Sequence, residues 1–319
     1  MCLGEFTVLI RGNSSNYLKN WYMSWLAFET NVLGRIEFDS VAIPFSRRPE
    51  LGMALKRRGK RVTANDILQS AWTLSLGTIQ NNTDRLSEAD LNTVLEDAYV
   101  PGFELDNPAL KNWFSESDAW WFDNVRRNID RLDSPYLFAI AASLAMGVGD
   151  YVLGFEERTR ELRLPLSKVY RRLWSQLPTP VNNSQINSCQ NKSANEFLAE
   201  SYVDLMFLRM PDSGSAFSSK ERWREEWLRV GTNFWRELDK AQAGKLGALA
   251  ETRSQSLRFL EDTLSIASNI KHWAISSTEG GLLATQDVVD TVAKIRRVDA
   301  IYTKDFSELL GQKAVIVTA

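Results

Sequence analysis

Two short apolar segments joined by a helix constrain the fold of this chain more than any other feature. Residues 40–43 and 61–64 each have the length and apolar character of a buried strand. Between them the pattern predicts a helix over residues 50–58, which Gly59 ends, and another helix follows over residues 67–79. Because a strand, a helix and a strand in succession cross over as a right-handed parallel unit, this segment predicts an α/β protein.

The C-terminal part of the chain returns to the same pattern. Residues 205–208 read as a short apolar strand, and residues 209–214 form the turn at its carboxyl end. Ligands of open α/β sheets bind at the carboxyl ends of the strands, so this turn and the one after Ile43 are the candidate site. The last two expected strands are close in sequence, which favours an antiparallel pair. Strands are expected at 270–275, 298–302 and 314–318, and helices at 220–241, 254–267 and 285–296.

The remaining segments differ in character. Residues 5–10 are expected to form a strand or an arm, and residues 17–33 a helix. Helices are also expected to start at Ser87, to run from Ser134 to Val152 with burial on all sides, and to cover residues 156–173, whereas 178–195 reads as a loop. The predicted division is 1–81 and 191–319 as the two parts of an α/β domain, with 82–190 as a helical insertion.

Composition excludes several classes of site. The 319 residues include only Cys2, Cys189 and His272 as cysteines and histidine, which argues against a disulfide framework, a metal site, a Ser-His-Asp triad and a Cys-His dyad. The N-terminus lacks the pattern of a signal peptide, and the apolar stretch from 135 to 149 is too short to span a bilayer. We therefore expect a cytoplasmic protein that does not enter a membrane.

The basic residues are clustered although the net charge is only −2. Such clusters are either solvated helix faces or a patch for the phosphates of DNA. The eleven tryptophans are expected in the core, with base stacking as the alternative. The candidate DNA-binding residues are Arg47, Arg48, Arg57, Arg58, Lys60, Arg126, Arg127, Arg171 and Arg172.

The order of these parts resembles the Dam-type (alpha-class) adenine-specific DNA methyltransferases. The likeness rests on Pro44 and Phe45 at the cofactor motif, Gly52 in the next helix, and Asn65-Asp66 at the ribose side. The resemblance implies a Rossmann-like S-adenosylmethionine-dependent methyltransferase fold, with a mostly parallel twisted sheet and an antiparallel last strand. It also implies that residues 82–190 correspond to a target-recognition domain.

The departures from the family concern the residues that touch cofactor and base. Ile43 stands where the family has the cofactor-motif Asp, and Arg47 and Pro49 stand where it has glycines that let the backbone approach the ligand. Arg209-Met210-Pro211-Asp212 replaces the catalytic Asp-Pro-Pro-Tyr, so a cation takes the place of the acceptor for the adenine amino group. Tyr17 fits the first motif, but Lys19 and Trp21 do not. Asp66 is the main retained position, and it also suits a simple turn.

The resemblance and its departures lead to one hypothesis and two alternatives. The hypothesis is a pseudo-methyltransferase without cofactor or metal, a DNA-recognition or structural subunit beside an active methyltransferase or another defence-system subunit. The alternatives are a divergent active methyltransferase that uses S-adenosylmethionine, and a protein-binding scaffold without DNA contact. Arg47 and Arg48 are expected to plug the old cofactor pocket by pairing with Glu50, Asp66 or Asp212, or else to bind a phosphate. Arg209 and Asp212 are expected to form a surface ion pair across their turn.

Overall fold

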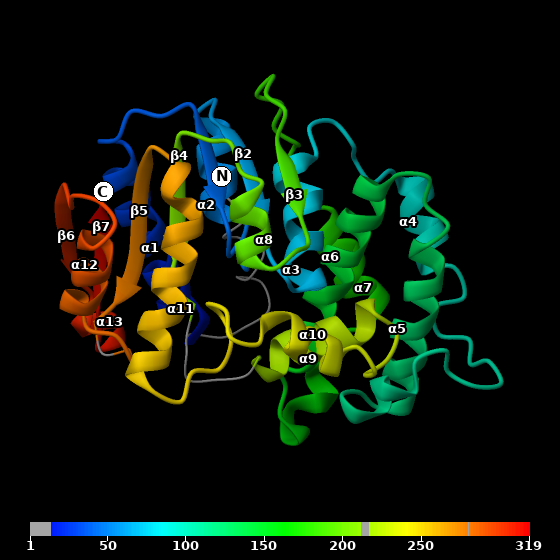
Figure 1. Cartoon of the computed structure of the whole chain (residues 1–319). Helices are drawn as coiled ribbons and strands as arrows, with labels where there is room; N and C mark the ends of the chain where they lie inside the picture. The colour runs from blue at the N-terminus through cyan, green and yellow to red at the C-terminus, as the bar shows by residue number, and fades with distance from the viewer. Residues whose placement is uncertain (1–13, 212–216, 280) are drawn as a thin grey trace.

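A seven-stranded sheet forms the centre of the molecule. The computed structural model describes residues 14–211, 217–279 and 281–319, so the expected segment 5–10 and Asp212 lie outside the described residues. The strand order is β3-β2-β1-β4-β5-β7-β6, in which β7 alone runs antiparallel to its neighbours (Figure 1). This arrangement confirms the mixed α/β class and the antiparallel final pair, and it is consistent with a methyltransferase fold. The strands are β1 (Ser40–Ile43), β2 (Arg61–Asn65), β3 (Ser188–Gln190), β4 (Leu205–Arg209), β5 (His272–Thr278), β6 (Ala300–Asp305) and β7 (Lys313–Thr318).

Helices cover both faces of the sheet because the central strands are apolar on both sides. Side chains alternate along each strand, so Val41 and Ile43 face one layer while Ala42 faces the other. The first layer contains α1 (Ser14–Leu33), α2 (Glu50–Arg57) and the short α13 (Ser307–Leu310). The second contains α8 (Ala194–Ala199), α11 (Arg253–Ile266) and α12 (Thr285–Ala293). Gly59 follows α2 with a φ of 81°, which confirms its predicted role in ending that helix.

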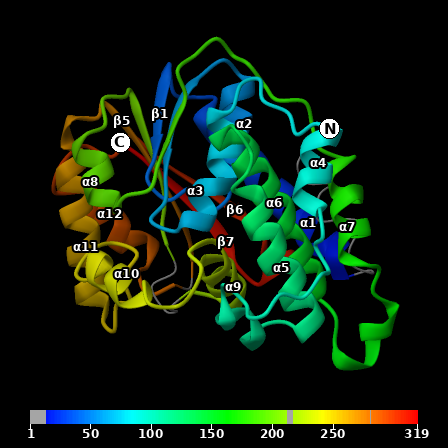
Figure 2. The same ribbon diagram turned by 90° about the vertical axis from the view of Figure 1, so that its right-hand side faces the viewer.

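A second, helical core lies beyond the β3 edge of the sheet (Figures 1 and 2). The helix α6 (Pro135–Val152) extends beyond the apolar stretch 135–149 that was expected to be too short for a bilayer, and it has the length and apolarity of a membrane span, but 61% of it is buried inside this core. After α3 (Gln69–Ser75) and the π-helical turn η2 (Leu76–Gln80), this region is built from α4 (Glu88–Leu95), η3 (Pro108–Asn112), α5 (Glu116–Ile129), α6 (Pro135–Val152), η4 (Glu157–Leu162) and α7 (Leu166–Trp174).

The helical core is not confined to residues 82–190. Trp223 and Trp227 of α9 (Ser219–Leu228), which follows β4, are both fully buried in it. The ring of Trp223 packs so tightly on α6 that a Cβ at Gly149 would lie 2.2 Å from its Cη2 atom. The segment after β4 therefore joins the helical region to the sheet.

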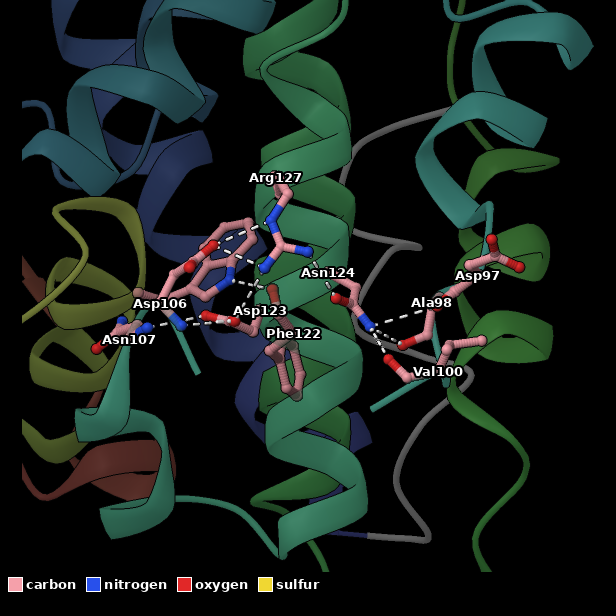
Figure 3. A network of polar contacts seen from close by, with 10 residues as sticks. Asp97, Ala98, Val100, Asp106, Asn107, Phe122, Asp123, Asn124 and Arg127 are labelled. Atoms are coloured by element: carbon pink, nitrogen blue, oxygen red, sulfur yellow. Dashed lines mark hydrogen bonds and ion pairs between the residues drawn. The ribbon is translucent and has the colours of Figure 1, made fainter. Parts of the chain in front are cut away.

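Neighbouring residues of α5 fix the long loop between α4 and α5 (Figure 3). The carboxylate of Asp123 accepts from the backbone N–H groups of Asp106 and Asn107 at the end of the loop. The amide of Asn124 donates to the backbone carbonyls of residues 97, 98 and 100 at its start. Both ends of the loop are thereby held on one helix.

Three expected elements were wrong. The helix predicted over 156–173 is divided, because the 3₁₀ helix η4 ends at Leu162 and α7 begins only at Leu166, after Pro165. The segment predicted as a loop over 178–195 contains β3, a short polar strand whose backbone pairs with β2 at the sheet edge. The helix predicted over 220–241 is two helices, α9 and α10 (Trp235–Gln242). Between them Val230 and Gly231 have φ angles of 52° and 135°, which no α-helix accommodates.

Candidate functional site

The two turns singled out by sequence lie side by side. Strands β1 and β4 are parallel neighbours, with Val41 opposite Leu205 and Ala42 opposite Met206. The turn after Ile43 and the turn after Arg209 therefore leave the sheet at the same edge, which we call the carboxyl edge. This edge is where relatives of such folds bind their ligands.

The turn after β1 is packed into the protein. The Asn65 side chain donates to the carbonyl of Pro44 at 3.1 Å, and the Ser46 N–H donates to the backbone carbonyl of Asn65 at 2.8 Å. Phe45 is buried in the same core cluster as Leu246 and Leu208. Hydrogen bonds thus hold the turn to the end of β2, and apolar side chains of the core cluster pack against Phe45.

The cover comes from the segment between α10 and α11. Gly247 has a φ of 96°, and a Cβ there would lie 3.0 Å from Cε1 of Phe45 and 3.9 Å from Cγ of Pro211. Leu246 is buried beside it. Residues after α10 therefore contact both turns of the carboxyl edge, Pro44–Phe45 on one side and Met210–Pro211 on the other.

Arg47 pairs with a carboxylate that the sequence did not single out. Its Nη1 atom lies 2.9 Å from Oε1 of Glu221 on α9, and its guanidinium lies 5.5 Å from the centre of the Phe217 ring. Glu221 was not among the partners expected for Arg47 and Arg48, which were Glu50, Asp66 and Asp212, and Asp212 lies outside the described residues. Arg48 is exposed next to it, and Pro49 precedes α2 with a helical φ of −77°.

Asp66 is fully buried at the end of β2. One oxygen of its carboxylate accepts from the backbone N–H of Leu68 at 3.0 Å, which is the turn role that sequence allowed. The other oxygen has no hydrogen-bond partner among the described residues. Burial raises the pKa of Asp66 to about 7, although the nearby Arg47 charge lowers it.

The N-terminus of α3, next to Asp66, is already occupied by a protein carboxylate. Glu225 of α9 is fully buried and accepts from the backbone N–H groups of Gln69 at 3.0 Å and Ser70 at 2.6 Å. It also pairs with Arg229 at 3.0 Å. A negative charge is favourable there because helix N-termini carry unpaired N–H groups.

Arg209 pairs with a buried carboxylate of α1, which the sequence did not single out. Its guanidinium binds Glu29 with two hydrogen bonds, of 2.6 Å and 3.0 Å, and Glu29 is 0% exposed. Glu29 also accepts from the indole of Trp25 at 2.8 Å and the hydroxyl of Ser276 at 3.4 Å. Arg209 thus links β4 to α1, and its expected pair with Asp212 lies outside the described residues and stays a prediction.

The predicted basic residues do not form one surface. Arg57, Arg58 and Lys60 lie where α2 ends and β2 begins, at the amino edge of the sheet, opposite Arg47 and Arg48. On α5, Arg126 pairs with Asp130 and Arg127 with Asp106. On α7, Arg171 donates to Asn92 and Arg172 is exposed. A single basic face built from all nine residues is wrong.

The remaining candidates from the sequence are the possible metal ligands, together with Cys189 and His272. Within the described ranges no three His, Cys, Asp or Glu side chains come together as metal ligands would. Burial raises the pKa of the Cys189 thiol to about 12, so this thiol is unreactive at neutral pH. His272 lies half-buried at the start of β5.

The sheet, its order and the two turns at its carboxyl edge define a methyltransferase-like α/β protein. A comparison with known proteins supports this class. The chain is 23% identical over 269 residues to the Type II methyltransferase M2.HphI of Haemophilus parahaemolyticus, and the match covers 76% of each chain. No protein-family profile matches the chain.

Proposed function

We propose that this protein is a pseudo-methyltransferase, a DNA adenine methyltransferase homologue that no longer transfers a methyl group. The observation that carries the proposal is the pair formed by Arg209 and Glu29. The resemblance assigns the position of Arg209 to the group that accepts from the adenine amino group. A guanidinium has donors only, so it cannot accept from an amine, and here its donors are directed to a buried carboxylate.

The surroundings of the cofactor motif support the same conclusion and do not fit S-adenosylmethionine. A glycine-rich cradle would leave its backbone open to the ligand, whereas Phe45 is buried under Leu246 and Gly247. Asp66, the retained ribose-side position, is fully buried, with one oxygen held by the N–H of Leu68. The ion pair between Arg47 and Glu221 supports the proposal that Arg47 fills this pocket, although Glu221 was not an expected partner.

The proposed role is that of a DNA-recognition or structural subunit in a cytoplasmic DNA modification or phage-defence system. Its partners are double-stranded DNA and an active methyltransferase or another subunit of that system. Support comes from the relative M2.HphI, whose name is that of a Type II methyltransferase.

A role as a protein-binding scaffold is the second candidate, and one surface feature favours it. Phe103 is fully solvent-exposed at the tip of the loop that Asp123 and Asn124 hold in place. An exposed aromatic ring on an ordered loop is typical of a protein contact. Glu104, the next residue, would repel DNA phosphates.

The proposal is tested by titrating the protein with S-adenosylmethionine in a calorimeter and by assaying methyl transfer to unmethylated duplex DNA. We expect no binding heat and no transfer, with an active adenine methyltransferase as the positive control in both assays. The variant Arg209→Asp should also stay inactive, because the cofactor side is blocked independently. Saturable binding together with methylated adenine in the product would establish the divergent active enzyme instead.

A further inference from the structure

The amino edge of the sheet, opposite the two turns of the candidate site, carries three arginines. Arg57 and Arg58 are exposed, and no ion pair joins either of them to another residue in the described part of the chain. Arg58 donates to the backbone carbonyl of Thr30 at 3.0 Å, and because a neutral carbonyl does not cancel a positive charge, Arg57 and Arg58 present their charge to solvent. Arg61 donates to the carbonyl of Tyr202 at 3.0 Å and lies near the carboxylate of Asp204.

An ordered, amide-rich loop lies directly beside these arginines. Residues 182–187 precede β3, and the loop projects beyond the sheet next to β2 and α2 (Figure 1). Asn183 donates to the carbonyl of Lys60 at 2.9 Å, and Asn187 accepts from the N–H of Val62 at 2.9 Å. Asn182 and Asn183 in turn accept from the N–H groups two residues further on. The loop is thus held in one conformation on the same edge as the arginines.

The same loop exposes the side chains that contact base edges and base steps in DNA. Ile186 is 86% exposed, although isoleucine is among the residues most often buried. Gln185 is exposed beside it. Amide side chains hydrogen-bond to adenine, and apolar side chains insert between base steps in the minor groove. Tyr202, 81% exposed, lies next to Arg61.

We propose that the amino-edge surface, formed by Arg57, Arg58, Arg61 and the loop 182–187, binds double-stranded DNA. The arginines contact phosphates on either side of a groove, and the loop enters that groove with Gln185 and Ile186. Two of the acids on this edge have basic neighbours: Asp39 lies 3.3 Å from Lys60, and Asp204, which accepts from Ser40, lies near Arg61. This site rests on the proposed DNA-recognition role, but it is separate from the turns where cofactor and base bind in the family.

The experiment measures anisotropy of a short fluorescent duplex with the full chain over a range of salt concentrations. The double variant Arg57→Ala/Arg58→Ala should weaken binding roughly tenfold and reduce the slope of log K against log salt by about 2, one for each lost phosphate contact. Ile186→Ala should weaken binding without the same loss of slope, because it removes a groove contact, adds no charge and leaves both arginines. The matched control is Arg158→Ala/Arg160→Ala on η4, which removes the same charge from another exposed segment.

The outcomes separate this site from the proposed function. Loss of affinity in the α2 and Ile186 variants with an unchanged η4 control supports the amino-edge surface. An unchanged affinity in the α2 variant, an equal loss in the η4 variant, or no duplex binding by the wild-type chain would overturn it. None of these results depends on S-adenosylmethionine, whose binding and transfer test the pseudo-methyltransferase proposal separately.

Discussion

Arg209 and Glu29 form a bidentate ion pair between the end of β4 and the C-terminal part of α1, with Nη2 2.6 Å from Oε2 and Nε 3.0 Å from Oε1. The carboxylate is completely buried, and Trp25 and Ser276 donate to it as well. A buried carboxylate with these donors is fully satisfied only while the arginine is present. The pair therefore links the first helix of the sheet layer to the carboxyl edge.

Removing the Glu29 charge should destabilise the protein because Arg209 would lose its partner in a largely buried site. We expect Glu29→Gln to lower the free energy of unfolding by about 3 kcal/mol in urea titrations. The control is Glu200→Gln, which breaks the exposed pair with Lys192 and should cost less than about 1 kcal/mol. If both substitutions lower the free energy of unfolding equally, the buried pair stabilises the protein no more than the exposed pair does.

The strands at the centre of the fold could be predicted because their apolar runs leave no other interpretation. The unit from β1 to β2 and the strand β4 follow from such runs, and Gly59 marks the helix end by its φ of 81°. By contrast, β3 is polar and half-buried at the sheet edge, so its sequence carries no strand signal.

The partners of the site residues could not be predicted, because they are distant in the chain. Arg209 is 180 residues from Glu29, and Arg47 is 174 residues from Glu221. Sequence reasoning therefore considered neighbours in the same turn. Glu29 itself was the only sequence signal for such a pair. A glutamate in an apolar helix such as α1 requires a cation or several hydrogen-bond donors as partners.

Asp66 should make stability depend on pH around neutrality. Its folded-state pKa is raised to about 7, whereas an unfolded Asp titrates near about 4. Between these values the folded state binds more protons, so the free energy of unfolding should fall as pH rises, by up to about 1.4 kcal/mol per pH unit. Asp66→Asn should flatten this fall and raise stability at about pH 8, measured by urea unfolding at several pH values.

Asp204 provides a control of opposite sign for the Asp66 experiment. Hydrogen bonds from the Ser40 hydroxyl and the Asp39 N–H lower the pKa of its carboxyl. Its stabilisation is therefore present at neutral pH and is lost as pH falls through that lowered pKa. Asp204→Asn should destabilise most at neutral pH. If Asp66→Asn leaves the slope between about pH 5 and pH 7 unchanged, the buried Asp66 carboxyl does not titrate there.

The contact between α6 and α9 should be intolerant of a single methyl group. Gly149→Ala places a Cβ where the Trp223 ring now lies, 2.2 Å from Cη2, so one helix must move. We expect a loss of about 2 kcal/mol in thermal or urea unfolding, despite the better helix propensity of alanine. Gly147→Ala on the same helix is the control, because its Cβ meets only the flexible end of Leu173 at 3.1 Å. Similar stability of both variants would mean that α9 does not pack as described.

The ordered conformation of the loop between α4 and α5 should depend on the side-chain amide of Asn124. Its nitrogen donates to the carbonyls of Asp97, Ala98 and Val100, at 3.3, 3.2 and 2.8 Å, and Asp97 has a positive φ of 49° (Figure 3). Asn124→Asp keeps the shape but turns an oxygen toward these carbonyls, which should cost about 2 kcal/mol and speed hydrogen exchange in residues 97–106. Asn92→Asp, an exposed position, should change neither quantity. Unaltered exchange in the loop of the Asn124 variant would show that other contacts hold it.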